Sequence, residues 1–362
     1  MEGKTSMIDI GQVLRDYRKS YKLTQEQLAE RLGVEPKTVI RWENGQSVRN
    51  VEKLHRYADL LGVSPVAFGL QPFRQRSPEE IDAVVAHGWG LMAQARYREA
   101  RNTLATLLLD VHIESDDETL LRALAPAYYL AGHVASITIR TGQIGQAISY
   151  FQTLQDIARQ IDDDSWLNVA LTYHGDMLRR TREISKALDY LQGARDITPQ
   201  ADFLAKGNNA QLLARVYVVQ GNMHDFEQEM RKAEEIAAGD PAASIHITYS
   251  LGTVYIEWAK ILAKQGKMEE ALRYNQLAKE HFPQNPRWGL LLKIARSEAM
   301  VYGGELEEGL KMAKEVTQLC LEQGDMRRLE RIYGIKKYLR QQRMRFGRAD
   351  DELEEMLEGQ IE

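Results

Sequence analysis

The side chains that could act chemically in this sequence are cations and hydrogen-bond donors, and none has the spacing of a catalytic centre. The 362 residues contain no GxSxG nucleophile turn, no GxxxxGK[ST] phosphate loop and no GxGxxG loop after a strand. Cys320 is the single cysteine, and no two of the eight histidines lie three or four residues apart. The sequence therefore predicts a protein that is not an enzyme and uses no metal or other cofactor.

The cations are distributed unevenly along the chain. The formal net charge of the whole sequence is −5. Residues 1–76, however, carry 13 Lys and Arg against 9 Asp and Glu, whereas the remainder is acidic. A mildly basic N-terminal region suits contact with phosphates, although so small an excess does not identify the partner by itself.

Four short helical patterns follow one another in the first seventy residues. In the second pattern, Thr24 is an N-cap with Gln27 three residues later, which is a capping box. Gly33 ends this helix because glycine adopts the left-handed conformation readily. The third helix begins at Pro36 and ends at Asn44. Two short helices joined by a glycine-containing turn predict a helix-turn-helix.

The string LTQEQLAERLGVEPKTVIRWENG closely resembles the Cro/C1 (XRE) family of helix-turn-helix regulators, and the resemblance covers residues 10–70. It implies that residues 36–44 form the recognition helix, whose N-terminal half faces the base edges of double-stranded DNA. It also implies that Arg18 and Glu43 form a structural salt bridge.

The resemblance assigns a role to individual residues. Lys37, Thr38 and Arg41 occupy the positions at which this family reads bases. Arg41 could pair with guanine N7 and O6, and Thr38 could contact a thymine methyl group or a phosphate. The positions that match phosphate contacts of the family are Gln25, Asn44, Ser47 and Arg49. For Lys37 and Arg41, simple exposure to solvent is the competing interpretation.

A recurring phrase follows a short predicted linker at residues 71–77. It combines a small residue at a corner with a second small residue and an aromatic or aliphatic one. Its six occurrences are ARYREARNTL (95–104), GQIGQAISYF (142–151), REISKALDYL (182–191), GNMHDFEQEM (221–230), GKMEEALRYN (266–275) and GELEEGLKMA (304–313). The second small position holds alanine in four copies, whereas Phe226 and Gly309 are poor fits. Repeats of this length predict stacked helical hairpins.

The repeats resemble tetratricopeptide repeats, although their spacing is longer than that family's 34 residues. The resemblance implies an all-α chain in which the helix-turn-helix is followed by a right-handed α-solenoid with a concave face. A plain all-α bundle is the alternative. We expect residues 1–70 to bind DNA, residues 78–348 to form the sensor and dimerisation domain, and residues 349–362 to form an acidic tail.

Counting along the first helix of each repeat assigns side chains to the concave face. The residues proposed to bind a ligand there are Arg140, Thr172, Asp176, Arg179, Asn208, Gln211, Arg215 and Lys260. Amides could hold the backbone of an extended peptide, and cations could hold its C-terminal carboxylate or an acidic side chain. Solvated helix faces are the alternative.

A helix-turn-helix joined to such repeats resembles the peptide-responsive regulators of the Rap, Rgg, NprR, PlcR and PrgX group. The resemblance implies a homodimeric regulator that binds an inverted-repeat operator and responds to a short signalling peptide. The alternative is a regulator or sequestering scaffold whose repeats bind a protein partner. Because the sequence has neither a secretory signal pattern nor a membrane-length apolar run, we expect a cytoplasmic protein without membrane contact.

The last predicted helix, residues 326–348, carries a cluster of lysines and arginines. Charge runs are usually solvated helix faces, and the acidic tail could neutralise this one. A second DNA-contacting patch is the alternative interpretation.

Overall fold

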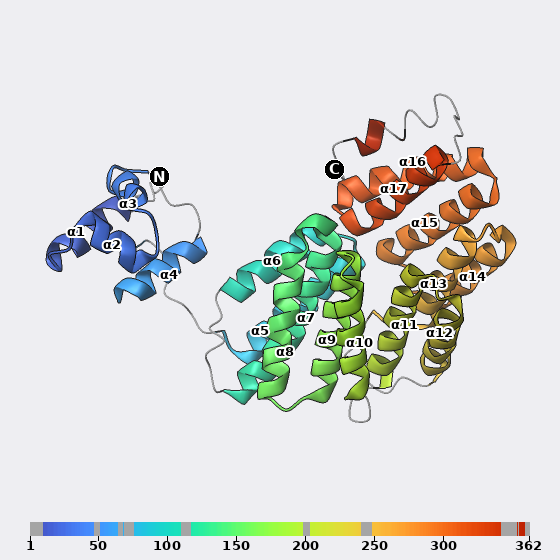
Figure 1. The fold of residues 1–362 in the computed structure, drawn as a ribbon, viewed down its shortest axis with the longest axis horizontal. Helices are drawn as coiled ribbons and strands as arrows, with labels where there is room; N and C mark the ends of the chain where they lie inside the picture. The colour runs from blue at the N-terminus through green and yellow to red at the C-terminus, as the bar shows by residue number, and fades with distance from the viewer. Residues whose placement is uncertain are drawn as a thin grey trace. The chain divides into compact units, whose positions relative to one another are not determined.

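The regular structure described by the computed structural model is entirely helical (Figure 1). The structure describes residues 10–46, 51–63, 68, 76–109, 117–197, 203–239, 248–341, 353 and 355–358. The prediction of an all-α chain, with a helix-turn-helix followed by a tetratricopeptide-like solenoid, is confirmed. No helix within those ranges is long and apolar enough to cross a membrane.

The chain divides into two compact units, and the second begins at Ser77. The helices of the first unit are α1 (Ile10–Ser20), α2 (Gln25–Leu32), α3 (Pro36–Glu43) and α4 (Val51–Leu61). They share an apolar core, in which Leu14, Leu28 and Val39 are fully buried. Helices α1 and α3 approach so closely that a Cβ on Gly11 would lie 2.1 Å from the carbonyl oxygen of Trp42.

The turn between α2 and α3 has the predicted capping residues. The amide of Gln27 donates to Thr24 Oγ1 at 3.2 Å, and the amide of Thr24 donates to Gln27 Oε1 at 2.9 Å. Gly33 has a φ of +65°, in the left-handed region that its missing side chain permits. Pro36 occupies the first turn of α3. These local interactions fix where the recognition helix begins.

The second unit is a series of helical hairpins. Its helices are α5 (Pro78–Ala93), α6 (Tyr97–Leu109), α7 (Glu118–Thr138), α8 (Gly145–Gln160), α9 (Asp164–Arg180), α10 (Ile184–Asp196), α11 (Phe203–Gln220), α12 (Met223–Ala238), α13 (Leu251–Lys264), α14 (Met268–His281), α15 (Pro286–Gly303), α16 (Leu306–Gln323) and α17 (Met326–Gln341), with the short 3-10 turn η2 (Thr141–Gln143) before α8. The six recurring phrases coincide with the starts of α6, α8, α10, α12, α14 and α16. The phrase therefore marks the second helix of each hairpin.

The two residues that fit the phrase poorly both pack closely against a neighbouring helix. Phe226 is buried, and its ring packs edge-on against Trp258, with centroids 5.2 Å apart. Gly309 is needed because a Cβ at that position would lie 2.7 Å from Val301 Cγ2. Both departures from alanine are therefore accommodated by the neighbouring helix.

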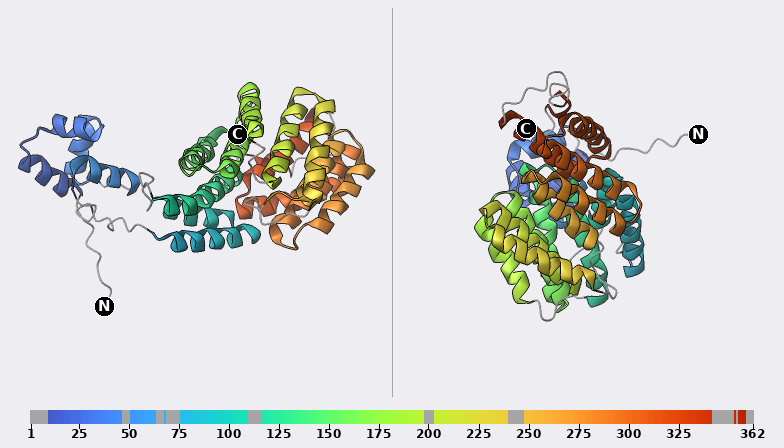
Figure 2. Two further views of the ribbon diagram at one scale, coloured as in Figure 1. Left: turned by 90° about the horizontal axis from the view of Figure 1, so that it is seen from below. Right: turned by 90° about the vertical axis from the view of Figure 1, so that its right-hand side faces the viewer.

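The series of hairpins closes on itself. Helix α17 packs against α7 as well as against α15 and α16, and α15 also contacts α5 (Figure 2). Polar contacts cross the same junction: Arg328 Nη1 donates to the Tyr97 hydroxyl at 2.9 Å, and the amide of Thr141 donates to Glu330 Oε1 at 2.9 Å. We call this junction of α15 and α17 with α6, α7 and η2 the seam. It encloses the inner surface of the solenoid.

The DNA-binding helix and a cationic cavity

The exposed side of α3 carries the residues expected to read bases. Lys37 and Arg41 are exposed, and Thr38 is half-buried. Ile40 is 39% exposed, which is unusual for a large apolar side chain and was not part of the sequence prediction. Val39 and Trp42 on the other side are buried in the core. The helix therefore presents a mixed cationic and apolar surface.

Lys37 also has a partner on the surface of the same unit. Its Nζ lies 2.7 Å from Glu35 Oε2, and both side chains are about two-thirds exposed. Exposed ion pairs of this kind contribute little stability. Lys37 can therefore leave Glu35 for a DNA phosphate or base at small cost.

The salt bridge implied by the family resemblance is present. Arg18 Nε lies 2.8 Å from Glu43 Oε1, and Gln25 Nε2 donates to Glu43 Oε2 at 2.7 Å. Burial opposes ionisation of Glu43, but the hydrogen bonds from Arg18 and Gln25 hold the pKa of its carboxyl below the ordinary value. The ionised Glu43 thus joins α1, α2 and α3.

The expected phosphate contacts lie in different surroundings. Gln25 is half-buried and engaged with Glu43, so this contact fixes its amide at the N-terminus of α2. Asn44 is exposed at the end of α3. Ser47 and Arg49 lie outside the described residues.

The second unit contains a partly open cavity of about 640 Å³. Its walls come from α7, α9, α11, α13, α15 and α17, the inner helices of the solenoid. A volume of this size is typical of sites that bind small molecules. Of the residues proposed to bind a ligand, those that line the cavity are Arg179, Asn208, Gln211, Arg215 and Lys260.

The other three residues are not in the cavity wall. Thr172 is fully buried between α9 and α11, where its hydroxyl accepts a hydrogen bond from Asn209 Nδ2 at 3.0 Å. Asp176 is 1% exposed and lies behind the arginines that it pairs with. Arg140 is half-buried at the start of η2. The sequence prediction counted positions along an ideal helix. Such counting cannot distinguish a residue that faces the cavity from one that faces the next helix.

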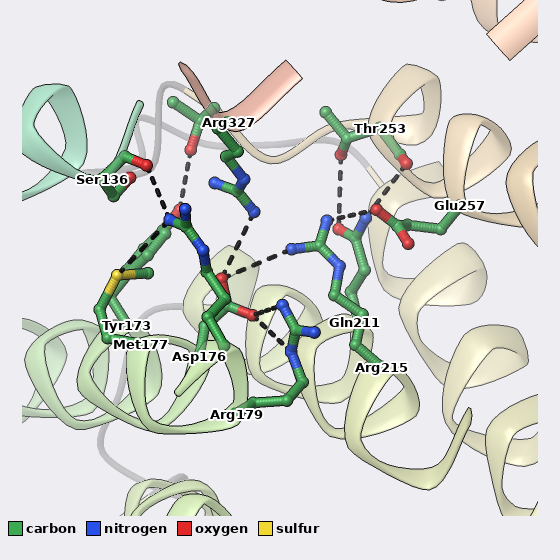
Figure 3. A network of polar contacts seen from close by, with 12 residues as sticks. Ser136, Tyr173, Asp176, Met177, Arg179, Gln211, Arg215, Thr253, Glu257 and Arg327 are labelled. Carbon is green, nitrogen blue, oxygen red and sulfur yellow. Dashed lines mark hydrogen bonds and ion pairs between the residues drawn. The ribbon is translucent and has the colours of Figure 1, made fainter. Parts of the chain in front are cut away.

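Asp176 is the centre of a charge network that joins three helices (Figure 3). Its carboxylate lies 2.7 Å from Arg179 Nη2, 3.8 Å from Arg215 Nη1 and 3.4 Å from Arg327 Nη2. Burial opposes ionisation, but the three arginines hold the pKa of Asp176 far below its ordinary value. Asp176 is therefore a structural counter-ion.

Glu257 on α13 continues this network. It pairs with Arg215 and with Lys260 Nζ, the latter at 3.2 Å. Burial again opposes ionisation, and these two cations lower the pKa of Glu257. Burial lowers the pKa of Lys260 to about 8, against the opposing effect of Glu257. Gln211 donates from Nε2 to the Thr253 carbonyl at 3.1 Å, which fixes its orientation in the wall.

The cavity wall has an excess of positive charge. Among the described residues that line it are ten lysines and arginines but only four aspartates and glutamates. The cations that line it from α15 and α17 were not assigned to this surface by the sequence: Arg287, Arg327, Arg328, Arg331 and Lys337. The start of the basic cluster at the C-terminus therefore faces the interior, and residues 342–348 lie outside the described part of the chain.

Several donors in this wall also lack acceptors. Within the described residues, Asn208 Nδ2, Arg215 Nε and Arg287 Nε are buried and have no hydrogen-bond partner. Buried polar groups are nearly always paired, and each unpaired group is costly. Because all three are donors, the missing partners are acceptors.

A recognition helix held by capped turns and a buried salt bridge defines the first unit as a helix-turn-helix DNA-binding module. The family described as helix-turn-helix matches residues 14–68. An uncharacterised helix-turn-helix-type transcriptional regulator of Methanothermobacter thermautotrophicus is 44% identical over 50 residues, which are 14% of this chain and 72% of that protein. The chain therefore belongs to the helix-turn-helix transcriptional regulators, as its resemblance to the Cro/C1 family implies. It is a DNA-binding regulator and not an enzyme.

Solved structures with similar folds include regulators and other helical-repeat proteins. Bacillus thuringiensis PlcR, in complex with the peptide PapR7 and DNA, is 16% identical with a TM-score of 0.41, covering 75% of this chain and 95% of that chain. ComR of Streptococcus vestibularis in its apo form is 14% identical with a TM-score of 0.33, covering 66% and 95%. The human IFIT1 dimer with PPP-AAAA is 13% identical with a TM-score of 0.39, covering 94% and 84%. All three scores lie below 0.5, so these likenesses do not identify a ligand for this chain.

Proposed function

We propose that the second unit of this transcriptional regulator binds an effector in the 640 Å³ cavity, and that occupancy changes its affinity for DNA. The observation that carries the proposal is the excess of cations and unpaired buried donors on the wall. A short signalling peptide suits this wall best, because its backbone carbonyls and C-terminal carboxylate are acceptors.

The DNA site in this proposal is the exposed side of α3 and its surroundings. Lys37, Thr38 and Arg41 read base edges in the major groove. Phosphate contacts come from Gln25, Asn44, Ser47 and Arg49. A single module of this size reads too few base pairs for tight specific binding, so the protein acts in the cytoplasm as a homodimer on an inverted repeat.

Coupling between the two sites follows from how the cavity is built. Successive inner helices supply its wall, and each packs mainly on its neighbours. A ligand that contacts several of them favours one curvature of the solenoid, provided that it binds that curvature more tightly than the other. In a dimer, a change of curvature alters the separation of the two recognition helices, which must be about 34–36 Å on adjacent major grooves.

A second candidate function is binding of a protein partner by the repeats. The observation that favours it is the exposure of two large apolar side chains on α11, Phe203 at 51% and Val219 at 53%. Neither residue lines the cavity. The two residues lie near opposite ends of α11, so a partner that contacts both would have to extend along the helix. Such a partner would make the protein a sequestering scaffold or a partner-controlled regulator.

The test of the proposed function is native mass spectrometry of the protein purified from its own host. We expect an additional mass of a few hundred to about 1,500 daltons that is released on denaturation and is sequenced as a peptide. Adding the released peptide back should shift a titration of operator DNA. An empty cavity together with a stoichiometric protein partner would favour the second candidate instead.

A further inference from the structure

Arg287 is a buried cation in the cavity wall without a carboxylate partner. It is the second residue of α15 and is 6% exposed. Its Nη2 donates to His133 Nε2 on α7 at 3.0 Å, and its guanidinium lies 4.6 Å from the centre of the Trp288 ring. No carboxylate of the described residues forms an ion pair with it, and its Nε has no hydrogen-bond partner there. A buried charge in this state is costly.

A second guanidinium in the same wall increases that cost. Arg328 on α17 is 8% exposed, pairs with the buried carboxylate of Asp325 and donates to the Tyr97 hydroxyl at 2.9 Å. Burial first, and then the charge of Arg328, lower the pKa of Arg287. Asp325 therefore pairs with Arg328 alone, and the positive charge of Arg287 at the seam is left without a counter-ion among the described residues.

We propose that Arg287 and Arg328 form an anion subsite at the seam, and that it receives a carboxylate or phosphate group of the cavity ligand. The unpaired Nε of Arg287 supplies a donor, and both guanidinium groups supply the charge. Asn208 on α11 offers a second buried donor, Nδ2, elsewhere in the same wall. This inference deepens the proposed function and rests on it only in assigning the anionic group to the effector.

The position of the subsite gives the anion a mechanical role. Arg287 joins α15 to α7, and Arg328 joins α17 to α6, so both belong to contacts that close the solenoid. Without an anion, like charges and an unpaired donor weaken the closed state. A bound anion removes both penalties and holds the two ends of the solenoid together. Ligand binding and closure of the seam are therefore linked.

Cys320 is a built-in reporter of this closure. It is the single cysteine, it is fully buried, and it packs in one cluster with Leu329 and Ile332 of α17. Because the thiol is fully buried in this cluster, a reagent reaches it only when the packed helices separate. Burial also raises the pKa of the thiol, which keeps it unreactive in the closed state. The rate at which a thiol reagent labels the native protein therefore measures opening next to the seam.

The experiment compares Cys320 labelling of the full-length protein in sodium phosphate and in sodium chloride at matched ionic strength and pH. At a phosphate concentration ten times its dissociation constant, binding to the closed state should slow labelling about tenfold. Arg287→Met should abolish this protection. The matched control is Lys264→Met, which removes another cation of the cavity wall that lies on α13. Phosphate also stabilises proteins non-specifically, so specific protection must saturate with concentration.

The outcomes separate an anion site from a purely structural arginine. If Arg287 belongs to an anion site, Cys320 of Arg287→Met should be labelled no faster than Cys320 of wild type in chloride, because the substitution removes an uncompensated buried charge. The inference would be overturned if phosphate slowed Cys320 labelling of Arg287→Met as much as that of wild type. It would also be overturned if Lys264→Met lost this protection to the same extent as Arg287→Met. If Arg287→Met fails to fold, Arg287→Lys, which keeps the charge without the planar fork, should show protection weakened several-fold. Unchanged protection in that variant would also count against the site.

Two further arms identify the chemistry and keep the inference distinct from the proposed function. Sodium acetate in place of phosphate tests whether a single carboxylate suffices, as the C-terminus of a peptide would require. Protection by either anion, combined with operator binding that no host peptide alters, would retain the subsite and reject the proposed function. If operator binding of Arg287→Met still responds to the host peptide as wild type does, the proposed function would be retained and the assignment of the peptide's anionic group to this subsite would be rejected.

Discussion

Arg327 on α17 lies 3.4 Å from the carboxylate of Asp176 on α9, although 151 residues separate them in the chain. The same carboxylate binds Arg179 on its own helix and faces Arg215 on α11. One buried anion therefore connects the middle of the solenoid to its last described long helix. The three arginines that it holds, Arg179, Arg215 and Arg327, all line the cavity.

The first prediction concerns the stability of that connection. Asp176→Asn removes the shared counter-ion of three arginines in a buried site, so we expect the free energy of unfolding to fall by about 3–5 kcal/mol. Urea denaturation measures this loss. Asp156→Asn, which breaks an exposed pair with Arg159, is the control and should have a much smaller effect. Equal losses in the two variants would show that the network contributes no special stability.

The second prediction concerns pH. Because the arginines outweigh burial, the pKa of Asp176 is lower in the folded than in the unfolded protein. The contribution of such a carboxylate to the free energy of unfolding is complete above its pKa in the unfolded chain, about 4. This contribution disappears as the pH falls towards the pKa in the folded protein. Wild-type stability should therefore decline with acidification below about pH 5 more steeply than that of Asp176→Asn. Parallel pH profiles would contradict the assignment.

The third prediction concerns DNA sequence preference. Arg41→Ala should weaken specific binding by about 1–3 kcal/mol and relax the preference at one position of each half-site. Selection of bound oligonucleotides from a random pool measures both effects. Gln25→Ala should weaken binding to all sequences more evenly, because a phosphate contact carries no sequence information. An unchanged preference in Arg41→Ala would show that α3 does not read bases in the expected register.

The fourth prediction concerns assembly. We expect residues 77–362, which retain the Ser77 cap of α5, to elute as a dimer, and residues 1–76 to elute as a monomer. Light scattering coupled to size exclusion measures both masses. A monomeric 77–362 fragment would assign dimerisation elsewhere and contradict the proposed sensor and dimerisation role.

The fifth prediction concerns the switch. Arg179 lines the cavity and pairs with Asp176, which retains two other arginines after its loss. Arg179→Ala should therefore reduce the response of operator binding to the native effector while ligand-free DNA binding stays intact. Titrations of operator DNA with and without effector test this. Arg215→Ala should also uncouple regulation, but at a larger cost in stability because it leaves Glu257 paired only with Lys260. A wild-type effector response in both variants would place the ligand elsewhere.

The local geometry of the DNA-binding unit could be predicted from the amino-acid sequence alone. The capping box of Thr24 and Gln27, the left-handed Gly33 and the first-turn Pro36 act within a few residues of each other, so their spacing predicts the helix ends directly. The six recurring phrases marked the second helix of each hairpin for the same reason. Small residues at a fixed place allow two consecutive helices to approach.

Which charged side chains share the cavity depends on the packing of helices that are distant in the sequence. The arginines of α17 read as an exposed charge run, yet Arg327, Arg328 and Arg331 line the interior because α17 returns to α7. Arg287 carried no sequence signal, and Asp176 proved to lie behind the wall. Closure of the solenoid depends on small rotations accumulated over successive hairpins. Local sequence patterns do not predict the accumulated rotation, so contacts between residues about 150 positions apart are found only in the folded structure.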